Sequence, residues 1–219
     1  RSLLQIAAAI GPHSTESMLR EIAGLPGEAM QRCLEALDRA EFLVRIDAEP
    51  DDMLEFPHEM IRQVTYDSMV EKVRESVHAR ILATLESSGR WHDEPNRLCY
   101  HATRAKDWQK AFTYGRAAAR RSLTRSAFAG AASYFETAMT ALDKMPFSRL
   151  RETDAVDLRI EARVAFMWSG KVAESFDLGK EAERRADAIG DIGRKVAAMT
   201  MRSGTQNFYG TPVEAIATG

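Results

Sequence analysis

Three side chains in this chain of 219 residues could in principle form a metal site: His92, Cys99 and His101. Imidazole nitrogens and thiolates are the usual ligands of zinc. Their spacing matches no zinc pattern, however, and a fourth ligand is missing from the neighbouring sequence. The sequence therefore predicts no metal site here.

Carboxylates and hydroxyls also lack the spacing that catalysis needs. The acidic turn at 49–52 has neither the alternating oxygen ligands nor the glycine of a calcium loop. No nucleophile elbow surrounds Ser14, Ser68 or Ser126, and the remaining carboxylate pairs are those expected on helix surfaces. We therefore expect no catalytic residues and no enzyme activity in this chain.

Two histidines remain, in the segment from Phe56 to Leu85. His58 follows Phe56 by two residues at a strand-to-helix switch, and Tyr66 comes eight residues after it. His78 lies on a helical stripe of Val77, Ile81, Leu82 and Leu85, which favours a buried structural histidine over a ligand. For His58 a simple alternative is a residue that caps the start of a helix.

The amino-acid composition limits the classes of partner that the chain is expected to bind. The formal charge of −2 and pI of about 6.3 give no general attraction to nucleic acid or membranes. Residues 116–125 contain four arginines, which we interpret as a solvated helix face. No apolar run approaches the roughly 18 residues of a membrane span, and no signal peptide is visible. We expect a cytoplasmic protein with Cys33 and Cys99 as buried free thiols.

The elements that position these residues differ between the two halves of the chain. Up to about residue 89, short helices precede a β-hairpin. Phe42, Val44 and Ile46 alternate with residues 43, 45 and 47, which indicates a strand, and residues 49–52 supply the turn. Two more helices follow. The expected elements are helices Leu3–Ile10, Thr15–Ala23, Glu28–Ala40, His58–Met69 and Glu71–Ser88, and strands Phe42–Ile46 and Met53–Phe56.

The second half is helical and rich in alanine, with short breaks that favour antiparallel helix hairpins. A weak internal repeat aligns residues 126–131, 170–175 and 210–215, and Phe135 with Ala138 and Gly179 with Ala182 occupy matching places. This favours a solenoid of helix pairs over an irregular bundle. The expected helices are Asn96–Ala105, Trp108–Leu123, Phe128–Asp143, Thr153–Trp168, Val172–Ile189 and Ile192–Asn207.

Three pieces of the chain resemble a known family. Residues 37–43 are similar to a third helix and first wing strand, residues 56–66 match a Phe-x-His segment followed by Tyr, and residues 74–86 match an Arg-x-x-x-His helix. Residues 101–111 resemble the entry into helical repeats. In this order they resemble the winged-helix and TPR-like region of bacterial STAND-type ATPases, which are AAA/NB-ARC-like proteins. ATPases of this type are often linked to class III adenylate or guanylate cyclases or to LuxR-family regulators. Leu82 departs from the alanine of the family pattern.

The resemblance implies a mainly α protein. It predicts a winged-helix module at 1–89, made of three helices, a short β-hairpin and two further helices, and a TPR-like α-solenoid at 90–219 that is truncated at its C-terminus. His58 would contact the phosphate of ADP bound by an upstream nucleotide-binding domain of the same protein. This chain has no GxxxxGK[ST] loop, so it needs no cofactor itself, and ATP or ADP belongs to the parent protein.

The expected function is therefore regulatory and non-catalytic, in signal transduction. The fragment would couple the nucleotide state of an ATPase to an output domain such as a cyclase, and its helical repeats would bind a protein or small-ligand effector at residues that the sequence does not identify. Two alternatives stay open: the middle region of a maltose-regulator-like activator of the LuxR family, and a freestanding TPR-type scaffold for protein–protein interaction. The expected third helix carries Glu28, Glu35 and Asp38 against two arginines, which argues against DNA binding.

Overall fold

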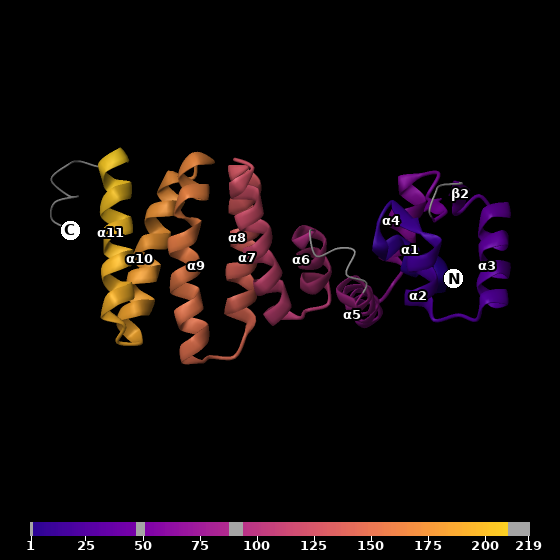
Figure 1. The fold of residues 1–219 in the computed structure, drawn as a ribbon, viewed down its shortest axis with the longest axis horizontal. Helices are drawn as coiled ribbons and strands as arrows, with labels where there is room; N and C mark the ends of the chain where they lie inside the picture. The colour runs from indigo at the N-terminus through magenta and orange to yellow at the C-terminus, as the bar shows by residue number, and fades with distance from the viewer. Residues whose placement is uncertain (1, 47–50, 88–93, 210–219) are drawn as a thin grey trace. The chain divides into compact units, whose positions relative to one another are not determined.

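The chain is mainly α-helical, as predicted, in a computed structural model that describes residues 2–46, 51–87 and 94–209 (Figure 1). For residues 207–209 only the backbone is described. The chain divides into two compact units: an N-terminal unit of residues up to 93 with 104–107, and a C-terminal unit of 94–103 with the residues from 108 onward. Among the described residues, no helix combines the length and the apolar character that crossing a membrane requires.

The N-terminal unit combines short helices with a small sheet, and α1 packs against α2, α4 and α5 at its centre. The α1 residues Ile6, Ala7, Ala8, Ala9 and Ile10 are all buried. A fully buried isoleucine contributes about 2 kcal/mol, and alanines let neighbouring helices come close. The elements in chain order are α1 (Ser2–Ile10), β1 (His13–Thr15), α2 (Glu16–Ala23), α3 (Gly27–Arg39), β2 (Val44–Ile46), β3 (Met53–Glu55), α4 (Glu59–Asp67) and α5 (Glu71–Ser87).

Local signals correctly located the start of α2. The hydroxyl of Thr15 accepts a hydrogen bond from the Met18 amide at 3.3 Å and so caps the helix. At the other end Gly24 adopts the left-handed conformation with φ of 62°, which only glycine adopts without strain. The expected helix from Thr15 to Ala23 is therefore confirmed to within one residue.

The sheet has an additional strand that the sequence analysis missed. The strand order is β1-β3-β2, with both neighbours antiparallel to β3, so that His13 and Val44 both pair with Glu55. β1 has three residues and directly precedes the cap of α2, which is too short a run for an alternating pattern to stand out. Pairing with a distant segment creates this strand.

The hairpin itself was predicted, but its buried face was not. Phe42 and Ile46 are 44% and 43% exposed, whereas Leu43 and Leu54 are each 2% exposed. Residues 42 and 43 precede β2, and the backbone there departs from a regular strand because Glu41 has φ of 55°. The alternation of Phe42, Val44 and Ile46 therefore does not mark the core.

The C-terminal unit is a succession of antiparallel helices in which α7 to α11 each pack on the next, and α9 also contacts α11 (Figure 1). The expected helix at Thr153 begins one turn earlier, at Arg149, because the Ser148 hydroxyl accepts a hydrogen bond from the Arg151 amide at 3.1 Å. The helices are α6 (Pro95–Arg104), α7 (Trp108–Thr124), α8 (Phe128–Lys144), α9 (Arg149–Trp168), α10 (Val172–Ala188) and α11 (Ile192–Tyr209).

Four of the turns between these helices share one backbone form. A residue with positive φ lies two positions before the next helix: Lys106 before α7, Ser126 before α8, Gly170 before α10 and Gly190 before α11. The first two copies of the sequence repeat, at 126–131 and 170–175, begin at two of these turns. The third copy, at 210–215, lies outside the described residues.

Small residues bring paired helices into close contact at two places. A Cβ built on Gly115 of α7 would lie 3.2 Å from the Ala138 Cβ of α8, and one on Gly179 of α10 would lie 3.2 Å from the Arg202 Cβ of α11. Phe135 and Ala138 are fully buried. The matching places assigned from the sequence therefore lie in helix–helix interfaces.

Candidate functional site

His58 lies at an exposed helix start in the N-terminal unit. It occupies the N-cap position of α4 with an extended backbone, φ −136° and ψ 125°. Within the described part of the chain its side chain makes no capping hydrogen bond, so the alternative of a locally bonded cap is wrong. His58 is exposed at the surface, and its imidazole forms no hydrogen bond with the first turn of α4.

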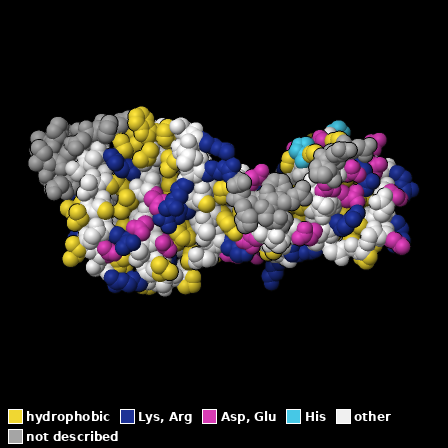
Figure 2. Space-filling view, in the orientation of Figure 1, with side chains coloured by type: hydrophobic (Ala, Val, Ile, Leu, Met, Phe, Trp, Pro, Cys, Tyr) yellow, Lys and Arg dark blue, Asp and Glu magenta, His cyan; other side chains and the backbone are white. Residues whose placement is uncertain are grey.

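Around His58 the surface is apolar. A shallow groove of about 680 Å³ surrounds it, and we name this surface the α4 groove. Met60 and Val64 are 76% and 64% exposed although both are hydrophobic. Figure 2 shows histidine beside hydrophobic side chains on this unit. The residues that line the groove are Phe42, Pro57, His58, Glu59, Met60, Ile61, Val64 and Thr65.

The orientation of α4 explains why these apolar side chains face outward. Arg62 donates a hydrogen bond from Nη1 to the Ala8 carbonyl oxygen of α1 at 3.2 Å, and it also pairs with Glu59. Tyr66, one turn further along, is buried. Because Arg62 and Tyr66 hold one side of α4 on the unit, Met60 and Val64 lie on the opposite side.

His78 is structural, as the sequence predicted. Its ring is fully buried, and its Nε2 lies 2.9 Å from the Tyr66 hydroxyl. Burial, together with the positive charges of Arg104 and Arg74, lowers the pKa of His78 to about 4. Arg74 also lies 5.4 Å from the centre of the Tyr66 ring and donates from Nε to the Met69 carbonyl. The contact between Tyr66 and His78 joins α4 to α5, and the His78 imidazole is neutral near pH 7.

The sulfur and histidine groups do not form a metal centre among the described residues. Cys99 is a buried free thiol, and burial raises its pKa to about 11, although a hydrogen bond with Thr103 opposes the shift. His101 is also buried, and His92 lies outside the described residues. Cys33 is a free thiol but is exposed on α3, so the prediction that both cysteines are buried is wrong for Cys33.

The acidic turn has a structural role. The Asp51 carboxylate accepts hydrogen bonds from the Ser17 amide at 3.3 Å and from the Ser17 hydroxyl. The Asp52 carbonyl accepts from the Glu16 amide at 2.9 Å. These contacts satisfy free amides in the first turn of α2, where negative charge is favourable.

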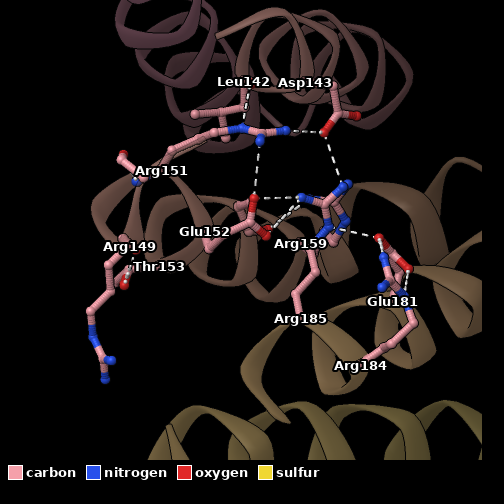
Figure 3. Close-up of polar contacts among 12 residues, drawn as sticks. Leu142, Asp143, Arg149, Arg151, Glu152, Thr153, Arg159, Glu181, Arg184 and Arg185 are labelled. Carbon is pink, nitrogen blue, oxygen red and sulfur yellow. Dashed lines mark hydrogen bonds and ion pairs between the residues drawn. The ribbon is translucent and has the colours of Figure 1, made fainter. Parts of the chain in front are cut away.

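A network of charges joins three helices of the C-terminal unit (Figure 3). The buried carboxylate of Glu152 accepts from Arg151 at 3.2 Å and from Arg185 at 3.0 Å, and both arginines also reach Asp143 of α8. A hydrogen bond from Arg184 lowers the pKa of Glu181 to about 2 despite the cost of its burial. Residues of α8, α9 and α10 are thereby held in a fixed register, which suits a stack of repeats.

The four arginines of 116–125 are not equivalent. Arg116 and Arg120 both pair with Glu161 of α9. Arg121 and Arg125 form no ion pair with any residue that the structure describes. Half of this basic run therefore joins α7 to α9, and the interpretation as a wholly solvated face is only partly right.

Sequence reasoning identified His58 but missed the groove that contains it. No buried face was assigned to the expected helix at 58–69, and Phe42 was expected in a strand. A signal was present: α4 carries apolar residues on more than one side, which exceeds what one core face needs. Which side is buried depends on the contact of Arg62 with α1.

Comparisons with models of known families, with curated proteins and with solved structures find no match for this chain. Membership of a family is therefore not shown, and the resemblance to STAND-type ATPases stays a prediction.

Proposed function

We propose that this chain is a non-catalytic regulatory region of a signal-transduction ATPase of the STAND type. In this proposal the N-terminal unit is a winged-helix-like module that docks on an upstream nucleotide-binding domain through the α4 groove. The C-terminal unit is a TPR-like stack that presents a surface to a protein or small-ligand effector. Nucleotide and output chemistry belong to other parts of the same protein.

The position of His58 carries the proposal. The imidazole is exposed at a helix start inside an apolar groove. It can therefore enter the nucleotide site of another domain when that domain covers the groove and excludes water from it. An imidazole N–H group can donate a hydrogen bond to a phosphate oxygen. Covering Met60 and Val64 would stabilise the docked state, because burial of exposed apolar side chains is favourable.

The order of elements supports the module. Helix, strand, two helices and a hairpin, with β3 between β1 and β2, is the arrangement found in winged-helix modules. The outer face of α3 bears exposed Glu28, Glu35 and Asp38 against Arg32 and Arg39. A helix that reads a major groove needs basic and amide side chains, so this face favours a protein partner over DNA.

The recurring turn supports the repeat assignment. Positive φ at Lys106, Ser126, Gly170 and Gly190 gives four helix connections the same geometry. Equivalent connections between antiparallel helices are what a solenoid requires, because each unit packs only on its neighbours.

The test begins with the longer gene product that contains this segment. We expect a GxxxxGK[ST] loop upstream and bound ADP in the purified protein. His58→Ala should release ADP roughly tenfold faster, because a lost hydrogen bond to a charged group costs about 1.5 kcal/mol. His13→Ala, an exposed histidine outside the groove, is the matched control. Absence of a nucleotide-binding motif upstream, or equal ADP release by the two variants, would contradict the proposal.

Docking through the groove has its own test. Met60→Glu places a charge on the apolar face without touching the core, because Met60 is 76% exposed. In the longer protein this change should increase protease cleavage between the nucleotide-binding domain and the module when ADP is bound. An unchanged cleavage pattern would show that the groove is not the docking surface.

A further inference from the structure

The N-terminal unit has a second hollow, which lies between α3 and the sheet and shares no residue with the α4 groove. Its volume is about 90 Å³, and we name it the α3 pocket. From α3 it is lined by Gln31, Leu34, Glu35 and Asp38, whose spacing of three and four places them on one face of the helix. A ligand in this pocket is therefore independent of the proposed docking through the α4 groove.

The inner side of the α3 pocket is apolar. It is formed by Leu34 of α3, by Leu43, which precedes β2, and by Leu54 of β3, which are 4%, 2% and 2% exposed. The remaining residue of the pocket is Arg45 of β2, which pairs with Leu54 across the sheet. An alkyl chain that enters the pocket would therefore contact leucine side chains.

The outer side of the pocket carries two carboxylates that lack a cationic partner. Glu35 and Asp38 are exposed, and neither forms an ion pair with a residue that the structure describes. Arg45 is the cation of the pocket, but it pairs with Glu16 and Asp52. The negative charges of Glu35 and Asp38 are therefore not neutralised within the described chain.

The position of these carboxylates on α3 is electrostatically unfavourable in the free chain. Asp38 lies in the last turn of the helix and Glu35 directly precedes that turn, where unpaired carbonyl groups make the helix end negative. Arg39 donates from Nε to the Glu35 carbonyl oxygen at 3.1 Å and not to either carboxylate. A cation beside Glu35 and Asp38 would therefore be attracted by both side chains and by the helix end.

An apolar inner side with an anionic outer side matches a side chain that has an alkyl stem and a cationic head. We propose that the α3 pocket receives a lysine or arginine side chain from a basic segment of a partner protein. The stem contacts the leucines, and the cationic head pairs with Glu35 and Asp38. The same negative charges repel phosphate groups, so a nucleic acid is not the partner at this face.

The surface beside the pocket favours a segment with several basic residues. A polar hollow of about 270 Å³ adjoins the pocket through Arg45, because Glu16 and Asp52, which pair with Arg45, line that hollow. Asp51 and Arg20 line it as well. The two hollows together hold five carboxylates and two arginines, an excess of three negative charges. A basic peptide can compensate this excess at several points.

Peptide probes separate the contribution of the stem from that of the charge. Fluorescence anisotropy measures binding of labelled hexalysine to the whole chain at pH 7, and binding is expected. A hexamer of diaminobutyric acid has the same number of ammonium groups on stems that are two methylene groups shorter. It should bind about fivefold more weakly, because less alkyl surface reaches the leucines. A hexamer of acetyl-lysine, which keeps the stem and loses the charge, should not bind.

Three outcomes with these probes would overturn the proposal. Absence of hexalysine binding would show that no basic segment is recognised. Equal affinity for hexalysine and for the diaminobutyric acid peptide would leave only general attraction between charges. Spermidine that binds as tightly as hexalysine would assign the pocket to a free polyamine.

Variants locate the binding. Glu35→Gln and Asp38→Asn should each weaken hexalysine binding about threefold, as expected for an exposed ion pair. Glu21→Gln removes the same charge from an exposed position of α2 that lines neither hollow, and it should change the affinity little. Gln31→Trp covers the mouth of the pocket at an exposed position without a change in charge, and it should also weaken binding. Equal affinities of the Glu21 and Asp38 variants, or an unchanged affinity of Gln31→Trp, would refute the assignment to this pocket.

Discussion

Acidification should destabilise the N-terminal unit through His78. The buried imidazole has a pKa of about 4 in the folded chain, against 6.5 for an unperturbed histidine. As the pH falls below 6.5 the unfolded chain takes up a proton that the folded chain accepts only near pH 4. Stability from this group is therefore complete above pH 6.5 and is lost progressively down to pH 4.

The size of the effect follows from the difference between the two pKa values. The interval from 6.5 to about 4 corresponds to about 3 kcal/mol at 1.36 kcal/mol per pKa unit. The structural cause is desolvation, reinforced by the positive charges of Arg104 and Arg74. Protonation would also remove the Nε2 lone pair that can accept the Tyr66 hydroxyl hydrogen, at 2.9 Å.

Hydrogen exchange of α5 amides measures this effect without interference from the C-terminal unit. The free energy of opening, determined at pH 7, 6 and 5, should fall more steeply in the native chain than in His78→Gln, which cannot titrate. Titration of carboxylates contributes equally to the pH dependence of the native chain and of His78→Gln, so this contribution cancels when the two are compared. Tyr66→Phe should be less stable at every pH yet keep the slope. Parallel pH dependence in native chain and His78→Gln would refute the reasoning.

Three further predictions concern stability and reactivity. Ser126→Gly should stabilise the C-terminal unit by about 1 kcal/mol in urea unfolding, because Ser126 has φ of 56°. Gly170→Ala should destabilise the same unit. If Ser126→Gly lowered the free energy of unfolding and Gly170→Ala raised it, the turns would be unstrained. Glu152→Gln should cost about 3 kcal/mol by the same assay, since two arginines then share a buried neutral group, and a loss below 1 kcal/mol would contradict this. Iodoacetamide at pH 7 should alkylate exposed Cys33 and leave buried Cys99 unmodified in peptide mass spectra; equal labelling would be inconsistent with the burial and raised pKa of Cys99.

Helix caps and apolar stripes, which are local sequence signals, correctly predicted most of the helices. Thr15 and Gly24 bound α2 as their side-chain and backbone preferences require, and the apolar stripe that includes His78 lies in the core. α9 begins at Arg149, one turn before the expected start at Thr153, because Ser148 caps it, and this signal too is local. These features depend on residues within one or two turns of each other.

Contacts between distant segments escaped the sequence analysis. β1 exists because His13 pairs with Glu55, and Met60 faces solvent because Arg62 reaches the Ala8 carbonyl, 54 residues away. Helical periodicity shows which residues share a face, but it does not show which face the rest of the chain covers.

The sequence by itself thus determined a mainly helical chain, most helix limits, the hairpin and His58 as the residue of interest, because caps, breakers and periodicity act locally. Only the tertiary structure decided that His58 lies in an apolar groove and that Glu152 is buried between two arginines. The physical reason is that burial and charge pairing depend on which segments meet, and that choice belongs to the packing of the whole unit.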